Sequence, residues 1–178
     1  MLDCDNTVAV IVDIQGKLAR IMHDSEAMID AACRLVRGAA ALELPIVWTE
    51  QNPDGLGPTV PELAELLPGE PIPKISFSCC GEPAFVSRLA AVGRNQVLLA
   101  GIESHICVYQ TAVGLGTMGY EVHLVADAIA SRTPRNRRIG LGRAQDEGAT
   151  VTSVEMALFE LLGEAKGDAF RQILRVVR

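Results

Sequence analysis

Short apolar runs alternate along this chain with longer stretches of helical apolar spacing. Five runs rich in Val, Ile and Leu predict strands that are buried on both faces, at residues 8–12, 45–48, 96–100, 122–125 and 149–152. Helices are predicted between and after them, over residues 24–42, 82–92, 105–118, 135–147 and 154–162. This alternation is typical of a doubly wound α/β fold, in which helices cover both faces of a parallel sheet.

Length and composition are consistent with one domain. A chain of 178 residues with 49% hydrophobic residues can bury a sizeable core. No internal repeat, low-complexity tract or linker interrupts the pattern. We therefore expect a single domain over residues 1–178, built as a three-layer α/β/α sandwich with a mostly parallel, doubly wound sheet.

Charge and cysteine content narrow the classes of partner. The net charge of −6 argues against a general nucleic-acid binder. The arginines between Arg132 and Arg143 are interpreted as a solvated helix face or a source of salt bridges between subunits. The five cysteines form an odd number without the pattern of a small secreted domain, which favours reduced thiols.

The hydropathy of the chain leads to two further expectations. No basic and apolar leader precedes Val8, and no apolar run reaches the roughly 18 residues that a membrane span needs. We therefore expect a cytoplasmic protein with no membrane partner. The mean hydropathy of +0.24 is compatible with apolar surface buried between subunits, so we expect a homo-oligomer.

Polar residues follow several of the predicted strands. Asp13, Thr49-Glu50 and the loop Gly101–Ile106 each come directly after an apolar run. Ligands bind beyond the carboxyl ends of the strands in sheets of this kind, so these positions should converge on a site. The irregular stretch Gln51–Thr59 is interpreted as a rim or lid of that site, and a surface excursion without a role stays open as the alternative.

Cys107 lies near the start of the predicted helix after that loop. Unpaired backbone N–H groups and the positive end of the helix dipole lower a cysteine pKa from about 8.5 toward neutrality, which predicts a reactive thiolate. The same N–H groups can stabilise an oxyanion formed when a thiolate attacks a carbonyl. An inert buried thiol remains the alternative.

Asp13 ends an apolar run, where a carboxylate is costly to bury unless it is paired or used. Lys74 is its natural partner. The lysine would keep the aspartate charged while apolar surroundings raise its basicity, and these opposing effects can tune Asp13 to accept a thiol proton. A purely structural ion pair between Asp13 and Lys74 remains the alternative.

Four segments together resemble the isochorismatase-like cysteine hydrolases, a superfamily that includes nicotinamidases and N-carbamoylsarcosine amidases. These segments are Val10–Gln15, Pro73–Ser78, Leu99–Val108 with Thr111-Ala112, and Val125–Ala128 with Ser131-Arg132. The resemblance implies that Asp13 is the general base, Lys74 its charge partner and Cys107 the nucleophile. It also implies a cis peptide at Ile102–Glu103, which would turn the Glu103 N–H toward that of Cys107 and form an oxyanion hole.

The residues after the second predicted strand point to one branch of this superfamily. Thr49–Gln51 followed by Gly55–Leu63 resembles the isochorismatase-domain branch. The nicotinamidases place an aspartate and two histidines here to hold a divalent metal, whereas Thr49 to Thr59 contains no histidine. His23, His105 and His123 also lack the spacing of a metal cluster. We therefore expect neither a metal nor another cofactor.

The resemblance and the residues together predict a metal-independent cysteine hydrolase. It would cleave a small amide-like C–N substrate through a thioester on Cys107, with the triad Asp13, Lys74 and Cys107. Two alternatives stay open. One is a vinyl-ether hydrolase of isochorismatase type that uses Asp13 without the thiol, and the other is a non-catalytic, redox-responsive or interaction protein with the same fold.

Four residues near the expected triad are candidates to bind substrate: Gln15, Gln51, Phe77 and Tyr109. Ordinary packing is the alternative for each of them. Because positions i and i+2 of a helix do not face each other, His105 is expected to line the pocket or a subunit contact rather than to form a catalytic pair with Cys107. Asp127 is expected to have a structural role. The two consecutive cysteines, Cys79 and Cys80, are expected to pack in the interior.

Overall fold

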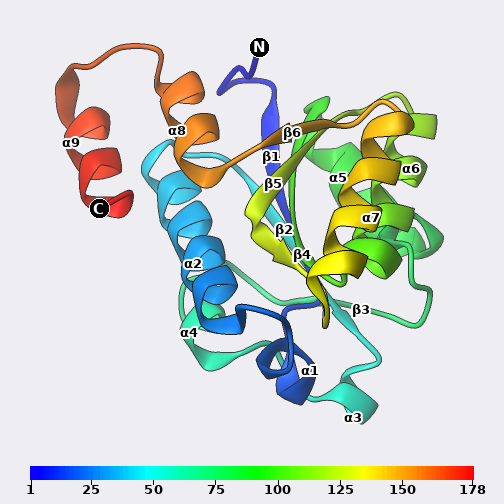
Figure 1. The fold of residues 1–178 in the computed structure, drawn as a ribbon. Coiled ribbons are helices and arrows are strands. Elements are labelled where there is room, and N and C mark those ends of the chain that lie inside the picture. The colour runs from blue at the N-terminus through cyan, green and yellow to red at the C-terminus, as the bar shows by residue number, and fades with distance from the viewer.

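The computed structural model describes residues 1–178 and contains one sheet of six parallel strands (Figure 1). The strands are β1 (Thr7–Val12), β2 (Ile46–Gln51), β3 (Ile72–Lys74), β4 (Gln96–Ile102), β5 (Glu121–Ala130) and β6 (Thr150–Thr152). Their order is β3-β2-β1-β4-β5-β6, and every neighbouring pair is parallel. The chain winds outward from β1 in both directions, so the switch of direction lies between β1 and β4, where ligands bind in doubly wound sheets.

Helices cover both faces of the sheet, which confirms the predicted three-layer α/β/α sandwich (Figure 1). One layer holds α2 (Ser25–Ala41), α8 (Val154–Leu162) and α9 (Gly167–Val176), and the other holds α5 (Pro83–Val92), α6 (Tyr109–Thr117) and α7 (Pro134–Asp146). Three short helices complete the fold: α1 (Gly16–Arg20), α3 (Pro53–Leu56) and α4 (Pro61–Ala64). A 3₁₀ turn, η1 (Cys79–Gly81), precedes α5, and a π-helical turn, η2 (Ser104–Val108), precedes α6.

The pleat of β1 divides the core into two parts. Ala9 and Ile11 point into the cluster under α2 and α8, whereas Val8, Val10 and Val12 point into the cluster under α5 and α6. All five side chains are buried, as expected of a central parallel strand with helices on both sides. The apolar run in the sequence thus corresponds to a strand without a solvent face.

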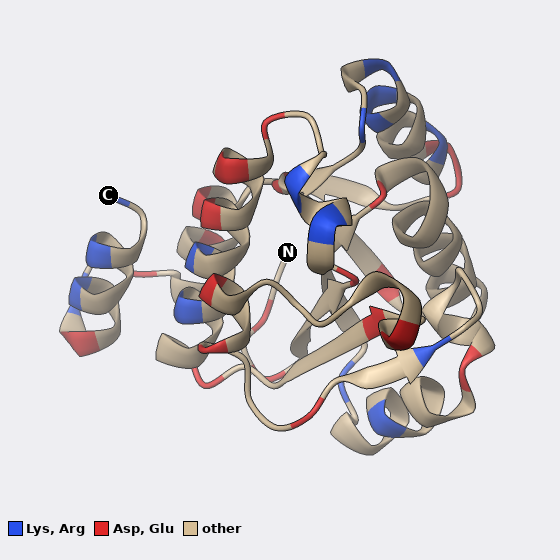
Figure 2. Cartoon of the chain, turned by 90° about the horizontal axis from the view of Figure 1, so that it is seen from below, with Lys and Arg blue, Asp and Glu red and all other residues tan.

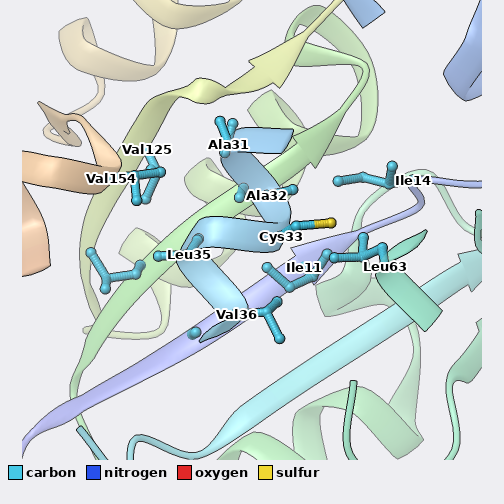
Figure 3. Packing of buried hydrophobic residues seen from close by; sticks show 14 of the residues in the cluster. Ile11, Ile14, Ala31, Ala32, Cys33, Leu35, Val36, Leu63, Val125 and Val154 are labelled. Carbon is cyan, nitrogen blue, oxygen red and sulfur yellow. The ribbon is translucent and has the colours of Figure 1, made fainter. Parts of the chain in front are cut away.

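Helix α2 supplies much of the first cluster (Figure 3). Its side chains Leu35 and Val36 lie near Ile11 of β1 and Leu63 of α4, and Val125 of β5 lies beside the same helix (Figure 3). This is the helical apolar face that the spacing in residues 24–42 predicts. Its burial holds α2 against the strands whose carboxyl ends carry the candidate site.

The apolar pattern missed β3 and shortened β5. Strand β3 has three residues, one of them Pro73, so it lacks the longer apolar run of a central strand. Strand β5 continues to Ala130 through a shift of register against β4. Asp127 therefore lies inside β5 rather than after it, and its carboxylate accepts a hydrogen bond from the N–H of Val154 at 2.9 Å, at the start of α8. Its expected structural role agrees with this contact.

Part of the stretch predicted to be irregular is helical, and the start of α2 has no side-chain cap. Gln51 ends β2 and Pro53–Leu56 forms α3, so the stretch from Gln51 to Thr59 is more regular than expected. Asp24 precedes α2 but makes no capping hydrogen bond, because its carboxylate pairs with His23 Nδ1 at 3.0 Å. The first-turn N–H groups of α2 thus have no side-chain cap.

Several basic residues lie on α7, as the blue segments of this helix in Figure 2 show, but not all of its arginines are part of a solvated face. Arg137 donates from its guanidinium to the carbonyls of Ala126 and Ile129 and so fixes α7 to β5. Arg143 lies over the ring of Tyr109, 4.7 Å from its centroid. None of the helices combines the length and apolarity required to span a bilayer.

Candidate active site

The carboxyl edge of the sheet brings Asp13, Lys74 and Cys107 together. Asp13 directly follows β1, Lys74 is the last residue of β3, and Cys107 lies in η2, which follows β4. The parallel strands end at the same edge, so these three positions meet although the chain separates them widely. The first contact is a buried ion pair, in which Lys74 Nζ lies 2.7 Å from Asp13 Oδ2.

Asp13 has a second partner in Thr49, at the same level of the neighbouring strand. The Thr49 hydroxyl donates to Asp13 Oδ1 at 2.7 Å, and the Asp13 N–H donates to the Thr49 carbonyl at 3.2 Å. Each carboxylate oxygen therefore accepts one strong hydrogen bond in a site from which water is nearly excluded. These contacts fix the direction in which Asp13 faces the cavity.

Lys74 also organises the chain that follows it. Its ammonium lies 2.7 Å from Gln51 Oε1 and 3.1 Å from the carbonyl oxygens of Ser76 and Phe77. Gln51 in turn donates from Nε2 to the carbonyl of Ile75 at 2.7 Å. The buried ammonium thus has acceptors for all its protons, and the segment that carries Phe77 is held at the mouth of the site.

The Cys107 thiol is protonated at rest, contrary to the expectation of a lowered pKa. Burial, as the largest effect, and the charge of Asp13 together raise the pKa of Cys107 to about 12, and Lys74 opposes them only in part. A hydrogen bond between the thiol and the Asp13 carboxylate also favours the neutral form. The start of a helix does not lower this pKa because the sulfur is desolvated beside a carboxylate.

Glu103 lines the same cavity, and its side chain pairs with the half-exposed Arg132. The peptide bond between Ile102 and Glu103 is cis, and no hydrogen bond from the Glu103 N–H to another backbone group is found. The buried Glu103 carboxylate accepts from the Arg132 N–H at 3.0 Å and from its Nε at 3.2 Å. Arg132 therefore neutralises a buried carboxylate that would otherwise lack a cation.

Two glycines allow the backbones around Cys107 to approach closely. A Cβ on Gly101, whose φ is +129°, would lie 2.1 Å from the carbonyl oxygen of Val12, so only glycine fits where β4 meets β1. A Cβ on Gly140 of α7 would lie 2.5 Å from the carbonyl carbon of Ser104. Helix α7 thus packs directly on the π-helical turn that presents Cys107.

Asp13 and Cys107 line one small cavity. Its volume is about 130 Å³, and its lining consists of Asp13, Leu18, Gln51, Leu56, Phe77, Ile102, Glu103, Ile106 and Cys107. Aliphatic and aromatic side chains therefore form most of the wall. The two lining groups that could react with a substrate are the carboxylate of Asp13 and the thiol of Cys107. Both lie where a carbonyl carbon entering the cavity would meet them.

The structure places two of the four expected substrate-binding residues in this lining, Gln51 and Phe77. Gln15 is buried away from the cavity, because its Nε2 donates to the carbonyls of Gln51 at 3.0 Å and Gly57 at 2.7 Å. Tyr109 packs under Arg143 and is likewise not part of the wall. Neither residue lines this cavity, and a contact of either with substrate stays a prediction from the sequence.

His105 and the extra cysteines lie outside the cavity. His105 Nδ1 is 3.0 Å from the Ser131 hydroxyl, so the ring is engaged away from Cys107. Cys79 is fully buried with its sulfur 3.7 Å from the Thr49 hydroxyl, and burial raises its pKa to about 11. No group of three or more His, Cys, Asp and Glu side chains is positioned to hold a metal ion.

The sequence analysis missed the bond from Thr49 to Asp13 and most of the apolar wall. Leu18 and Leu56 come from α1 and α3, which are too short to show helical periodicity. Ile102 and Ile106 flank the loop already recognised, but nothing in their spacing tells which face meets the cavity. The bond from Thr49 could have been predicted, because its hydroxyl and the Asp13 carboxylate both come near the ends of neighbouring strands.

Comparison with known proteins shows which families and structures this chain resembles. The family model described as the isochorismatase domain matches residues 7–156. Isochorismatase domain-containing protein 2 of Xenopus laevis is 36% identical over 174 residues, covering 97% of this chain and 83% of that protein.

Two solved structures are also similar. The MAR1 ribonuclease from Caenorhabditis elegans has a TM-score of 0.93 at 33% identity, covering 99% of this chain and 91% of that one. YcaC from Pseudomonas aeruginosa, with hexane-2,5-diol and covalent acrylamide, has a TM-score of 0.92 at 26% identity, covering 98% and 90%.

Proposed function

Since the chain belongs to the isochorismatase-domain family of hydrolases, we propose that it cleaves the C–N bond of a small amide-like substrate through a thioester on Cys107. One observation carries the proposal. The Cys107 thiol and the Asp13 carboxylate line the same cavity, and a buried lysine contacts the carboxylate at 2.7 Å. A nucleophile beside an oriented base is the arrangement that covalent acyl transfer requires.

The first half-reaction begins from a neutral thiol. Asp13 takes the Sγ proton of Cys107 as the sulfur attacks the substrate carbonyl carbon, so no free thiolate has to exist in the resting site. The carbonyl oxygen becomes an oxyanion that the N–H groups of Glu103 and Cys107 would stabilise. When the tetrahedral intermediate collapses, the C–N bond breaks, the leaving nitrogen receives the proton from Asp13, and a thioester remains on Cys107.

The second half-reaction returns the site to its starting state. Asp13 takes a proton from a water molecule, whose oxygen attacks the thioester carbonyl carbon. Collapse breaks the C–S bond and releases a carboxylic acid, and the sulfur recovers the proton from Asp13. Lys74 keeps its contact with Asp13 Oδ2 throughout, which leaves the carboxylate oriented but does not make Lys74 a proton carrier.

The likeness to the Pseudomonas aeruginosa protein suggests which small compounds to test on this fold. That structure is described as holding covalent acrylamide, a small uncharged carboxamide. The same fold in that protein therefore accommodates a molecule of the class proposed here. The acrylamide is a property of that protein, and for this chain it indicates the size and chemistry of test compounds.

A second candidate function uses Asp13 alone. Asp13 itself lines the cavity, and the Cys107 thiol is neutral at rest, so a vinyl ether could be protonated by the carboxylic acid form of Asp13 without any attack by sulfur. The two reactions separate by mutation. Amide hydrolysis requires both residues, whereas vinyl-ether cleavage is lost in Asp13→Ala and retained in Cys107→Ala.

The cavity does not favour the activity named for the Caenorhabditis elegans relative. A phosphodiester is anionic, and recognition of phosphate depends on Lys, Arg or metal ions near the reacting group. No lysine or arginine is among the lining residues, whose two ionisable carboxyl groups are those of Asp13 and Glu103. RNA therefore belongs in the assay as a comparison substrate, and its cleavage would count against the amide proposal.

The test is hydrolysis of a panel of small amides by wild-type protein and three variants. Cys107→Ala and Asp13→Asn should each lower turnover by roughly three orders of magnitude or more. Cys4→Ala, at a partly buried thiol away from the cavity, is the matched control and should keep wild-type turnover. Mass spectrometry of acid-quenched wild type should show the acyl group on Cys107.

Three outcomes would overturn the proposal. Wild-type turnover in Cys107→Ala would remove the nucleophile, and retention of vinyl-ether cleavage in that variant would support the second candidate. Absence of turnover with every amide, vinyl ether and RNA, together with a Cys107 no more reactive than Cys33, would support a non-catalytic protein.

A further inference from the structure

The cavity at Cys107 offers an incoming molecule apolar contacts and no positive charge. Five of its lining residues are Leu18, Leu56, Phe77, Ile102 and Ile106. No lysine, arginine or histidine lies among the nine residues of the wall. A negatively charged group that entered would leave water without gaining a cation.

The polar side chains of the wall are already paired. Asp13 accepts from Thr49 and Lys74, each at 2.7 Å. Gln51 uses Oε1 to accept from Lys74 at 2.7 Å, and its Nε2 donates to a backbone carbonyl, also at 2.7 Å. The Glu103 carboxylate accepts from Arg132 at 3.0 and 3.2 Å. Gln51 Nε2 has a second N–H, but this donor carries no charge, so no lining side chain offers a cation to a carboxylate or another anionic group.

The apolar wall continues to the surface. Phe77 is 56% exposed and Leu56 36% exposed, and both also line the cavity. Ile75, two residues before Phe77, is 74% exposed. Exposed apolar side chains that continue into a cavity are typical of a surface that contacts an apolar ligand. The mouth of the site is therefore suited to hydrocarbon rather than to charge.

The volume limits what fits inside. A cavity of about 130 Å³ is smaller than the roughly 300–1,000 Å³ typical of pockets for drug-sized ligands, so it accepts only a small group. A three-carbon primary amide is such a small group. A longer hydrocarbon tail would have to extend through the mouth, along Leu56 and Phe77.

From these observations we propose that the substrate of this site is an uncharged carboxamide with a short aliphatic acyl group, and that substrates bearing a carboxylate are rejected. This inference rests on the proposed amide hydrolysis and specifies its substrate class. It also separates the site from a vinyl-ether hydrolase for a dicarboxylate such as isochorismate, since such a molecule would bring two negative charges into a cavity without a cation.

The experiment compares two amides that differ in one group. Butyramide ends in a methyl group, and succinamate carries a carboxylate in its place. We expect kcat/KM to favour butyramide by about tenfold or more, because the carboxylate of succinamate would lie unpaired against the apolar side chains of the mouth. Equal values, or a preference for succinamate, would overturn the inference.

Substitution at the mouth tests the cause of the preference. Phe77→Arg places a cation at the exposed edge of the cavity and should shift the ratio of kcat/KM by about tenfold toward succinamate. Met156→Arg is the matched control, because Met156 is 61% exposed on α8, away from the cavity, and the change in net charge is the same. A shift of the same size in both variants would show a general charge effect and overturn the assignment to this cavity.

Alkylation of Cys107 separates failure of this inference from failure of the proposed function. Iodoacetamide and iodoacetate differ in charge but react with the same sulfur, and glutathione supplies the intrinsic ratio of their rates. The ratio of the iodoacetamide rate to the iodoacetate rate at Cys107 should be about tenfold higher than for glutathione. Such a ratio supports the rejection of charged substrates even if neither amide is hydrolysed. In that case only the proposed amide hydrolysis fails. A Cys107 ratio equal to that of glutathione overturns the inference, whether or not amides are hydrolysed.

Discussion

Lys74 is a charged residue in the protein interior. Its side chain is fully buried, and its ammonium lies 2.7 Å from Asp13 Oδ2. Burial of either charge alone would be costly, whereas the pair with its surrounding carbonyl and amide acceptors is satisfied. The same pair therefore serves both folding and the proposed chemistry.

The first prediction separates these two roles. Lys74→Met leaves the Asp13 carboxylate buried without its cation and should lower the free energy of unfolding by about 3–5 kcal/mol, as measured by urea denaturation. The double variant Lys74→Met with Asp13→Asn leaves no unpaired charge and should recover more than half of that loss while staying inactive. A double variant less stable than the single one would contradict a charge-pairing role for Lys74.

The second prediction concerns pH. Because burial and Asp13 raise the pKa of Cys107 to about 12, the thiol keeps its proton across the neutral and mildly alkaline range. The neutral thiol, which is the form that reacts in the proposed mechanism, then has a constant population, and kcat/KM for an amide should stay flat from about pH 7 to about pH 9.5. A rise of about tenfold per pH unit near pH 8 would instead indicate attack by a preformed thiolate.

At the scale of elements, η2 is held in place from two sides. Strand β4 leads into it, and α7 packs on it so closely that Gly140 has no room for a Cβ. The thiol position thus depends on a helix that contributes no lining residue of the cavity. This arrangement supports the chemistry through packing rather than through contact with substrate.

The third prediction tests that support. Gly140→Ala should displace η2 and lower both turnover and stability, the latter by about 1–3 kcal/mol, because the added carbon would lie 2.5 Å from the Ser104 carbonyl carbon. Gly142→Ala is a matched control in the same helix, where a Cβ meets nothing within 4 Å. It should be neutral or stabilising by up to about 1 kcal/mol. Equal effects of the two substitutions on turnover and thermal unfolding would refute the packing role.

At the scale of the whole molecule, several large apolar side chains remain exposed outside the cavity. Ile21 and Ile139 are among them, as are the methionines at positions 118 and 156. Such surface is commonly covered when identical subunits assemble. The homo-oligomer therefore stays a prediction, which the exposed apolar side chains support. The cytoplasmic location stays a prediction from the sequence.

The fourth prediction follows from that surface. Sedimentation equilibrium should give a mass that is a multiple of the 19.0 kDa chain, because assembly removes exposed aliphatic groups from water. Raised salt should leave this mass unchanged if apolar contacts dominate the interface. A mass of one chain at micromolar concentration would contradict the expectation.

The apolar pattern alone determined much of the architecture. Continuous Val, Ile and Leu runs identified β1, β2, β4, the first part of β5 and β6, since strands buried on both faces have no polar alternation. The pattern did not reveal β3 or the short helices α1 and α3, because three to five residues carry too little periodicity. Those short elements supply Lys74, Leu18 and Leu56.

Sequence by itself therefore determined the fold class through the apolar pattern and the family through the resemblance of its segments. That resemblance, together with the residue types at strand ends, led to the three residues proposed for chemistry, because a parallel sheet gathers its strand ends at one edge. Only the tertiary structure decided the state of the Cys107 thiol, which depends on burial and on the distance to a carboxylate. It also decided that Gln15 packs inward, that Arg132 neutralises Glu103, and that the cavity wall carries no cation. These features depend on which side chains meet in space, a relation that the order of residues along the chain does not contain.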